Sequence, residues 1–397
     1  MNFKAIAGWA AALLLLGAGH ANAVVKPDPA PPMNAPDAFA WKLFLVANAP
    51  AGGTRSTFET WASDTDTFRP NPVFPTTATP LSLHPPALQQ SILSGLQAAG
   101  QPLPQVPPGA GALEETRRNK ATFDFIVKNK LFSISGLKAG FGKDFSFPLD
   151  AVEVKANWIA LTDVPVFSGN RVSVADAPKF FHVNTGTDGK KYALVSMHVI
   201  SKATPNWTWA TFESEFNPGR CAILGCRDSF GATTAYVPPN ANGSKAYGPC
   251  AKTPALAALI VKAKLEAAYT HYCLKGSQVD FTDNTGLNVR LGNSVTEDGF
   301  VDSSSCMTCH SRSAWAPNGT ATSQAGFLSF SPLRAPVGPI DPHWYWTSLP
   351  TPPNRPTPPA AGATRTGTSA DFVWSIAFCA YDDTDPAHPK PSPCTGK

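Results

Sequence analysis

The sequence predicts a mixed α+β fold, with a central antiparallel sheet, flanking helices and long proline-rich loops. Segments rich in Val, Ile, Trp, Phe and Thr lie in the middle of the chain and are separated by turn residues, a pattern typical of antiparallel strands. Apolar residues recur at helical spacing on both sides of these segments. The 40 prolines are about twice the ordinary usage, so much of the surface is expected to be extended or irregular.

Residues 1–23 have the features of a secretory signal peptide. Lys4 gives a positively charged start, and Ala5–Gly17 is apolar but too short to cross a bilayer as a helix. The small residues of Ala21-Asn22-Ala23 form a cleavage pattern. A retained membrane anchor is the alternative, and its short length argues against it. Residues 24–397 are therefore expected to form a single exported domain, in which 332–368 is a proline-rich covering segment.

The charge balance excludes some classes of partner. Charged residues make up 15% of the chain and nearly cancel, with a formal net charge of +4. This composition does not indicate a nucleic-acid surface or a polybasic membrane surface. No later segment is apolar over enough residues to predict a membrane span in the mature chain.

Three helices are expected in the first third of the chain, at Ala38–Ala47, Pro86–Ala99 and Leu113–Phe132. The first carries Phe39, Trp41, Phe44 and Leu45 at helical spacing. The third has two glutamates in its first turn and two lysines near its end, an order that complements the helix dipole.

The centre of the chain is expected to form the sheet. The predicted strands are Val152–Leu161, Lys179–Val183, Tyr192–Ser201 and Trp207–Phe212. Asp188-Gly189 lies between two of these strands and indicates a hairpin turn. After the sheet, Thr253 as N-cap and Pro254 at the first helical position predict a helix that runs to about Tyr272.

The eight cysteines divide into two groups. Two of them belong to Cys306-Met307-Thr308-Cys309-His310, and the other six predict three disulfides with fifteen possible connectivities. Proximity in the sequence favours Cys221–Cys226 and Cys379–Cys394, which leaves Cys250–Cys273. Metal binding by these six is disfavoured, because they lack paired C-x-x-C spacing and a nearby histidine pair.

The C-x-x-C-H segment, Cys306–His310, predicts covalent attachment of one haem c. In a helical turn, the two thiols can form thioethers with the haem vinyl groups, and the histidine that follows can ligate the iron. The serines at 303–305 offer an N-cap, and Ser311–Trp315 could continue the helix. The alternatives are a redox-active dithiol and a structural disulfide within the motif. The export signal favours haem c, so we expect a haem-binding helix in the C-terminal third.

The second iron ligand cannot be a downstream methionine, because none follows Met307. His198 is the preferred candidate. In a regular strand, Met197 would lie on an apolar face with Ala193, Val195 and Val199, and His198 would lie on the opposite face. The alternative is a buried histidine bonded to a backbone carbonyl. The remaining candidates are His84, His182, His271, His343 and His388, of which His343 lies in an aromatic segment that could cover a haem edge or anchor the proline-rich tail.

Several sequence blocks resemble a family of large mono-haem c-type cytochromes from proteobacterial periplasms, whose function is largely unassigned. The blocks are LVSMHVISK at 194–202, NWTWATFE at 206–213, Leu291-Gly292-Asn293 with Glu297, SCMTCH at 305–310 and DFVWS at 371–375. They cover about half of the mature chain. The resemblance implies that the histidines matching His198 and His310 recur in the family. The chain departs from the pattern at Ser214, where the family has histidine.

Two main functions are consistent with the sequence. The first is electron transfer by a periplasmic cytochrome with two protein ligands to iron and an unknown redox partner protein. The second is a haem-dependent oxidoreductase, peroxidase-like or oxygenase-like, with an open or displaceable iron position. Glu213 or Glu215, near Trp207 and Trp209, could then accept protons. A binder of gas or another small ligand would have the same sequence features.

Overall fold

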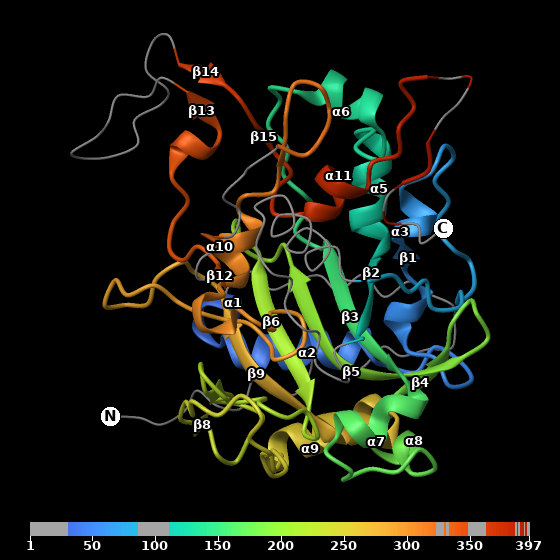
Figure 1. Cartoon of the computed structure of the whole chain (residues 1–397), viewed down its shortest axis with the longest axis vertical. Helices are drawn as coiled ribbons and strands as arrows, with labels where there is room; N and C mark the ends of the chain where they lie inside the picture. Colours follow the sequence, from blue (N-terminus) through green and yellow to red (C-terminus); the bar gives the residue numbers. More distant parts are fainter. Residues whose placement is uncertain are drawn as a thin grey trace, which may run out of the picture.

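A computed structural model describes residues 31–85, 111–322, 329–330, 333–347, 363–385, 387, 390–392 and 394. These residues form a mixed α+β structure around one antiparallel sheet (Figure 1), as predicted. The predicted signal peptide at 1–23 and the helix predicted at Pro86–Ala99 lie outside the described residues. Within the part of the chain that is described, no helix is long and apolar enough to cross a membrane.

The central sheet has seven strands, in the order β1-β2-β3-β5-β6-β9, with β4 also paired to β5. Every pairing within it is antiparallel. Its strands are β1 (Ala62–Ser63), β2 (Leu113–Arg118), β3 (Val152–Ala160), β4 (Val183–Thr185), β5 (Lys191–Ser201), β6 (Thr208–Ser214) and β9 (Tyr272–Gln278). Four two-stranded sheets are also described. They pair β7 (Cys226–Arg227) with β8 (Tyr236–Val237), β10 (Ala314–Trp315) with β15 (Thr368–Ser369), β11 (Ser329–Phe330) with β12 (Leu333–Arg334), and β13 (Trp346–Thr347) with β14 (Thr364–Arg365).

The described helices surround the sheet. The α-helices are α1 (Pro31–Asn34), α2 (Pro36–Ala47), α3 (Asp64–Thr67), α5 (Lys120–Lys128), α6 (Ile134–Gly140), α7 (Val164–Phe167), α8 (Ala177–Phe180), α9 (Pro254–Ala263), α10 (Cys306–His310) and α11 (Trp374–Cys379). Short 3₁₀ helices are η1 (Thr57–Thr60), η2 (Leu161–Asp163), η3 (Ala267–His271), η4 (Val301–Ser303) and η5 (Pro342–Trp344).

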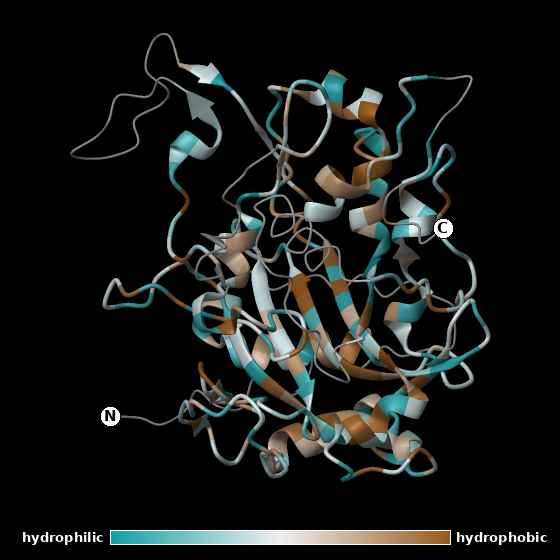
Figure 2. Ribbon diagram, in the orientation of Figure 1, coloured by the Kyte–Doolittle hydropathy of each residue, from teal (hydrophilic) through white to brown (hydrophobic). Residues whose placement is uncertain are grey.

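One face of the sheet is covered by α2 and α9, which confirms the first predicted helix. Aromatic side chains form the centre of this layer: the Phe44 ring lies 4.4 Å from that of Phe212, and the Trp41 ring lies 5.0 Å from it. Leu256 and Ile260 of α9 belong to the same buried cluster. In Figure 2, α9 and much of the central strands have hydrophobic colours, whereas the loops around them are largely teal and white.

The helix predicted over Leu113–Phe132 is wrong in its first part, where β2 forms instead. The charged residues there do not lie in a solvated helical turn. Arg117 pairs with Glu115, and Arg118 pairs with Asp64 and Glu153, all of them buried. Helix α5 begins only after Asn119, whose side chain accepts a hydrogen bond from the Thr122 amide. Long-range ion pairs, which local sequence cannot reveal, therefore override the helix-dipole pattern.

Two other boundaries also differ from the predictions. Lys179–Val183 is not a strand, because α8 ends at Phe180 and β4 begins only at Val183. The helix capped by Thr253, with Pro254 at its start, is confirmed. It ends at Ala263, because Lys264 adopts a left-handed conformation with φ of 54°. The remainder of the predicted helix forms η3 and leads into β9, a strand that the sequence analysis missed.

All three disulfides favoured by sequence proximity are confirmed. The Cα–Cα distances are 5.0 Å for Cys221–Cys226, 5.9 Å for Cys250–Cys273 and 5.2 Å for Cys379–Cys394, within the normal range. The hairpin turn at Asp188-Gly189 is also confirmed, since β4 pairs with β5 on either side of it. Gly189 has φ of 78°, which its lack of a Cβ allows.

A buried histidine connects η1 to the sheet. His182 donates through one ring nitrogen to Glu266, at 2.6 Å, and its other nitrogen lies 3.2 Å from Glu59. Burial alone would lower the pKa of His182, but the hydrogen bonds and charges of the two glutamates raise it to about 9. The protonated ring therefore stabilises the native state.

We predict that His182→Gln removes a pH-dependent part of the stability. The pKa rises on folding from 6.5 to about 9, so this contribution is fully present below pH 6.5 and is lost as the pH rises through 9. The difference in unfolding free energy between wild type and variant should narrow by about 3 kcal/mol over that range. Denaturant titrations across pH measure it. The exposed His343→Gln is the control, and a pH-independent difference for His182→Gln would contradict the prediction.

Candidate functional site

The C-x-x-C-H segment forms the short helix α10 beside the ends of β6 and β9 (Figure 1). Gln278 at the end of β9 holds its first turn: its amide nitrogen donates to Ser305 Oγ at 3.0 Å, and its Oε1 accepts from the Met307 amide at 3.2 Å. Ser305 is the N-cap residue, but its side chain makes no capping hydrogen bond. The predicted continuation through Ser311–Trp315 is wrong, because the chain turns after His310 and Ala314–Trp315 pairs with β15.

His310 is held from two sides. Its Nδ1 donates to the backbone carbonyl of Phe372 at 2.8 Å, and its ring packs 4.6 Å from that of Trp209. Burial lowers the pKa of His310 to about 4, so the ring is neutral near pH 7. With the proton on Nδ1, the Nε2 lone pair is available to a metal, as in the usual second shell of a histidine ligand.

The carbonyl that receives this hydrogen bond lies in a strained turn. Asp371 and Phe372 have φ of 47° and 73°, a left-handed conformation that costs about 1–3 kcal/mol for such residues. Trp374, two residues further on, donates from its indole nitrogen to the Cys309 carbonyl at 3.2 Å. The turn before α11 contacts His310, and the first residue of α11 contacts Cys309.

The two motif cysteines are free thiols, whereas the other six form disulfides. Burial, with the charge of Glu297 as the next cause, raises the pKa of Cys309 to about 12, and burial also raises that of Cys306. Two reduced thiols on one helical turn, followed by a neutral histidine with an oriented tautomer, fit the requirements of haem c attachment. Cys306, Cys309 and His310 are the residues that would hold it.

His198 lies on the same face of the sheet as α10. It pairs with Thr211 of β6, two residues from the Trp209 that packs on His310. Its Nε2 accepts a hydrogen bond from the Asn293 amide at 2.9 Å. Burial and then the charge of Lys155 lower the pKa of His198 to about 3, so this ring is also neutral.

A β-bulge changes the alternation of β5 just before His198. Asn157 pairs with Ser196 and Trp158 with Leu194, so Val195 is the extra residue on β5. The predicted regular alternation is therefore wrong: Leu194 joins Met197 and Val199 in the core beneath the sheet, while Ala193 and Val195 pack in another cluster. The expectation that Met197 is core and His198 faces the other way holds.

The loop at 291–297 covers the polar face of the sheet and forms hydrogen bonds with the side chains on that face. The side-chain nitrogen of Asn293, Nδ2, also donates to Thr211 Oγ1 and to Thr296 Oγ1, each at 3.2 Å. The amide and hydroxyl of Ser294 both donate to Glu213, and the Thr296 hydroxyl donates to Asn157 at 2.8 Å. Asparagine, serine and threonine suit this role because they offer donors and acceptors at short reach.

Three more charged residues complete the site. Glu297 Oε1 lies 3.6 Å from His198 Nε2. Burial raises the pKa of Glu297 to about 7, although Asn293, Lys155 and Lys275 act in the opposite direction. Lys275 is the extra residue of a second bulge, on β9, and its buried Nζ lies 3.5 Å from Glu213. Buried ionisable groups at such density are typical of functional sites.

Among the described residues, the other candidate histidines pair away from the motif. His84 lies 3.7 Å from Asp64, and His271 lies 2.8 Å from Glu215, so Glu215 is also remote from the site. His343 contacts Asp341. Its neighbours Trp344 and Tyr345 donate to the carbonyls of Arg312 and Ser311, so this part of the proline-rich segment is anchored just after the motif. His388 lies outside the described residues.

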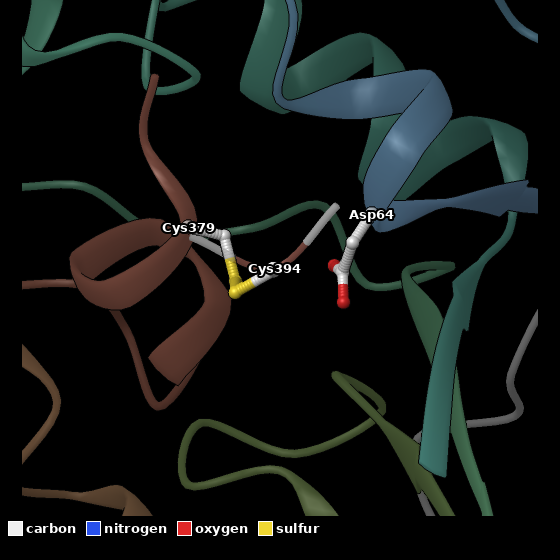
Figure 3. A group of neighbouring side chains, drawn as sticks. All are labelled: Asp64, Cys379 and Cys394. Carbon is white, nitrogen blue, oxygen red and sulfur yellow. A yellow bond between two sulfur atoms is a disulfide. The ribbon is translucent and has the colours of Figure 1, made fainter. Parts of the chain in front are cut away.

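Two other groups of potential metal ligands contain disulfide-bonded cysteines. Figure 3 shows the first, where the Asp64 carboxylate faces the Cys379–Cys394 disulfide. The second combines Glu215 with Cys250–Cys273. Since the thiolate is the metal-binding form of cysteine, neither oxidised pair offers a metal site.

Several site residues have no signal in the sequence. Lys155, Lys275 and Gln278 carry no motif, and each lies on a strand at a position that only the sheet register brings near α10. The backbone carbonyl of Phe372 has no side-chain signature at all. Asn293 and Glu297 were indicated only through the family resemblance. Comparison with known protein families, with curated proteins and with solved structures finds no match to this chain.

We predict that alkylation of the haem-free chain, unfolded without reductant, labels Cys306 and Cys309 only. In the folded chain at pH 8, Cys309 should react on the order of a thousandfold more slowly, because its pKa rises from 9.0 to about 12 and the thiolate is the reactive form. Peptide mass spectrometry measures both effects. Full reduction, which should expose all eight cysteines, is the control. Labelling of any other cysteine without reductant would contradict the assignment.

Proposed function

We propose that the chain is a periplasmic c-type cytochrome that binds one haem covalently through Cys306 and Cys309 and ligates its iron with His310. The observation that carries this proposal is the pair of free cysteines, Cys306 buried and Cys309 half-buried, beside a histidine whose Nδ1 is fixed by the Phe372 carbonyl. A redox dithiol fits less well, because burial raises the pKa of both thiols and a reactive thiol needs the opposite shift. Disulfides elsewhere in the chain are compatible with an oxidising compartment.

Electron transfer to an unknown redox partner protein is the primary proposal. Haem c supplies a one-electron iron couple, and a protein with two strong ligands can change oxidation state without binding a substrate. His198 is proposed as the second ligand, since its neutral ring lies on the face that carries α10. Its Nε2 accepts from Asn293, so ligation through Nε2 requires this amide to turn away.

The same hydrogen bond favours a second candidate, a haem-dependent oxidoreductase. If Asn293 kept its hydrogen bond to His198, the iron would have one coordination position without a protein ligand, which a substrate could occupy. Glu297, with a pKa of about 7, could then exchange protons with a bound substrate near neutral pH. Lys155 and Lys275 would balance the charge of such a site.

The first test is covalent haem attachment. We predict that the full-length chain, exported together with a haem-maturation system, retains haem after denaturation, and that the double variant Cys306→Ala, Cys309→Ala retains none. Met307→Leu lies inside the motif without changing a haem-binding group, so it should keep the haem. Peroxidase staining of denaturing gels and the pyridine haemochrome spectrum measure the attachment. A wild-type chain without covalent haem would refute the proposal.

The second test distinguishes the two functions by iron coordination. For the electron carrier, we predict a low-spin, six-coordinate wild type that binds CO slowly, and a His198→Ala variant that becomes high-spin and binds CO quickly. His343→Ala, at an exposed histidine outside the site, should match the wild type. Optical and EPR spectra measure both states. A high-spin wild type would favour the oxidoreductase, and an unchanged His198→Ala spectrum would remove His198 as a ligand.

A further inference from the structure

The turn at Asp371 and Phe372 holds a conformation that needs external support. Two successive residues other than glycine have positive φ, and for a bulky residue such as phenylalanine this is a genuine outlier. Such strain persists only where the surroundings impose it. The contacts of Asp371 supply this support.

Asp371 is anchored through both carboxylate oxygens. Oδ1 accepts from Lys202 Nζ at 2.6 Å, and Oδ2 accepts from the Phe147 amide at 2.7 Å. Lys202 Nζ also donates to the Pro205 carbonyl at 2.7 Å. Lys202 and Asp371 are only 4% and 7% exposed, so the ion pair is shielded from water, and removal of either partner leaves a buried charge uncompensated. The anchor connects the end of β5 and the segment before β3 to the turn.

The anchored turn presents its carbonyl to the motif histidine. The Phe372 carbonyl accepts from His310 Nδ1, and the Phe372 ring lies 6.1 Å from Trp209, which packs on the other side of His310. A relaxed backbone at Asp371 and Phe372 would rotate this carbonyl. The Lys202–Asp371 ion pair thus supports the backbone conformation at Asp371 and Phe372, and this conformation places the carbonyl that orients His310.

We propose that Lys202 and Asp371 are positioning residues that hold the Phe372 carbonyl on His310 Nδ1 and thereby set the donor strength of His310 toward iron. This inference rests on the proposed haem function. A strong Nδ1–H···O bond makes the imidazole more basic, which stabilises the ferric state and lowers the reduction potential. Loss of the anchor weakens that bond and shifts the iron toward the ferrous state.

The sign of the change in potential separates positioning from simple electrostatics. Lys202→Met removes a positive charge, which by Coulomb's law alone would favour the ferric state and lower the potential. Loss of positioning acts in the opposite direction. We predict that Lys202→Met raises the potential, with about a tenfold shift of the reduction equilibrium toward ferrous iron, or about 59 mV for one electron. Lys202→Arg, which can still pair with Asp371, should restore most of the wild-type value.

The experiment uses the haem-loaded, full-length protein, with redox titration and EPR of the ferric form as readouts. Asp371→Asn is the second variant: asparagine keeps an acceptor for the Phe147 amide and tolerates positive φ, but it loses the ion pair, so its potential should also rise. The matched control is Asp228→Asn, since Asp228 is another buried aspartate that accepts backbone amides, from Phe230 and Gly231, and its side-chain donor is Trp41 of α2. Its potential should not change.

Three outcomes decide the inference. A raised potential and altered EPR spectrum in Lys202→Met, restored in Lys202→Arg, support it. A lowered or unchanged potential in a folded, haem-loaded Lys202→Met overturns it while leaving haem binding intact. If Lys202→Met does not fold, the EPR spectrum of Asp371→Asn decides instead, because loss of its negative charge alone would also raise the potential: a changed spectrum supports the inference, and an unchanged spectrum overturns it. Failure of the wild type itself to carry covalent haem would instead refute the proposed function.

Discussion

The structure depends on hydrogen-bond partners for the buried polar side chains on one face of the central sheet. The face that carries His198 and Glu213 is buried as fully as the aromatic face beneath it, and each polar group removed from water without a partner costs about 1–3 kcal/mol. The loop at 291–297 supplies those partners through Asn293 and Ser294. The position of this loop also places α10, because Cys306 Sγ donates to the Leu291 carbonyl and the Leu291 amide donates to that of Ser304.

Two β-bulges adapt the sheet to its two different faces. The extra residue Val195 changes the alternation of β5, so that core residues occur on both sides of it while His198 stays on the polar face. The bulge leaves Val195 without a partner residue on β3. The Val195 carbonyl instead accepts a hydrogen bond from the Asn217 side chain at 2.9 Å. The bulge at Lys275 places a lysine near Glu213. Both bulges lie beside the candidate site, where such irregularities are common.

The candidate site is assembled from segments that are distant in the sequence. Strands β5 and β6 provide His198, Thr211 and Trp209, while the C-terminal turn provides the carbonyl that orients His310. The five blocks that carry the family resemblance meet at this one place, although the resemblance itself rests on sequence alone. The arrangement gives His310 fixed surroundings and gives His198 a hydrogen-bonded position that Asn293 can either retain or release. That difference separates the two proposed functions.

The sequence by itself predicted the α+β class and favoured the disulfide pairing that the structure confirms, because strand and helix patterns and the nearness of two cysteine pairs are local features. Thr253 and Pro254 likewise start α9 through a local cap, as predicted. Only the tertiary structure decided that Leu113–Arg118 is a strand, since Arg118 finds buried acidic partners, Asp64 and Glu153, far along the chain. The tertiary structure also placed Leu194 and His198 on opposite faces of the sheet. Regular alternation would put them on one face, but the extra residue Val195 shifts the alternation of β5 by one position. The carbonyl of Phe372 shows the limit most clearly: every residue has a carbonyl, and only the fold selects the one that His310 meets.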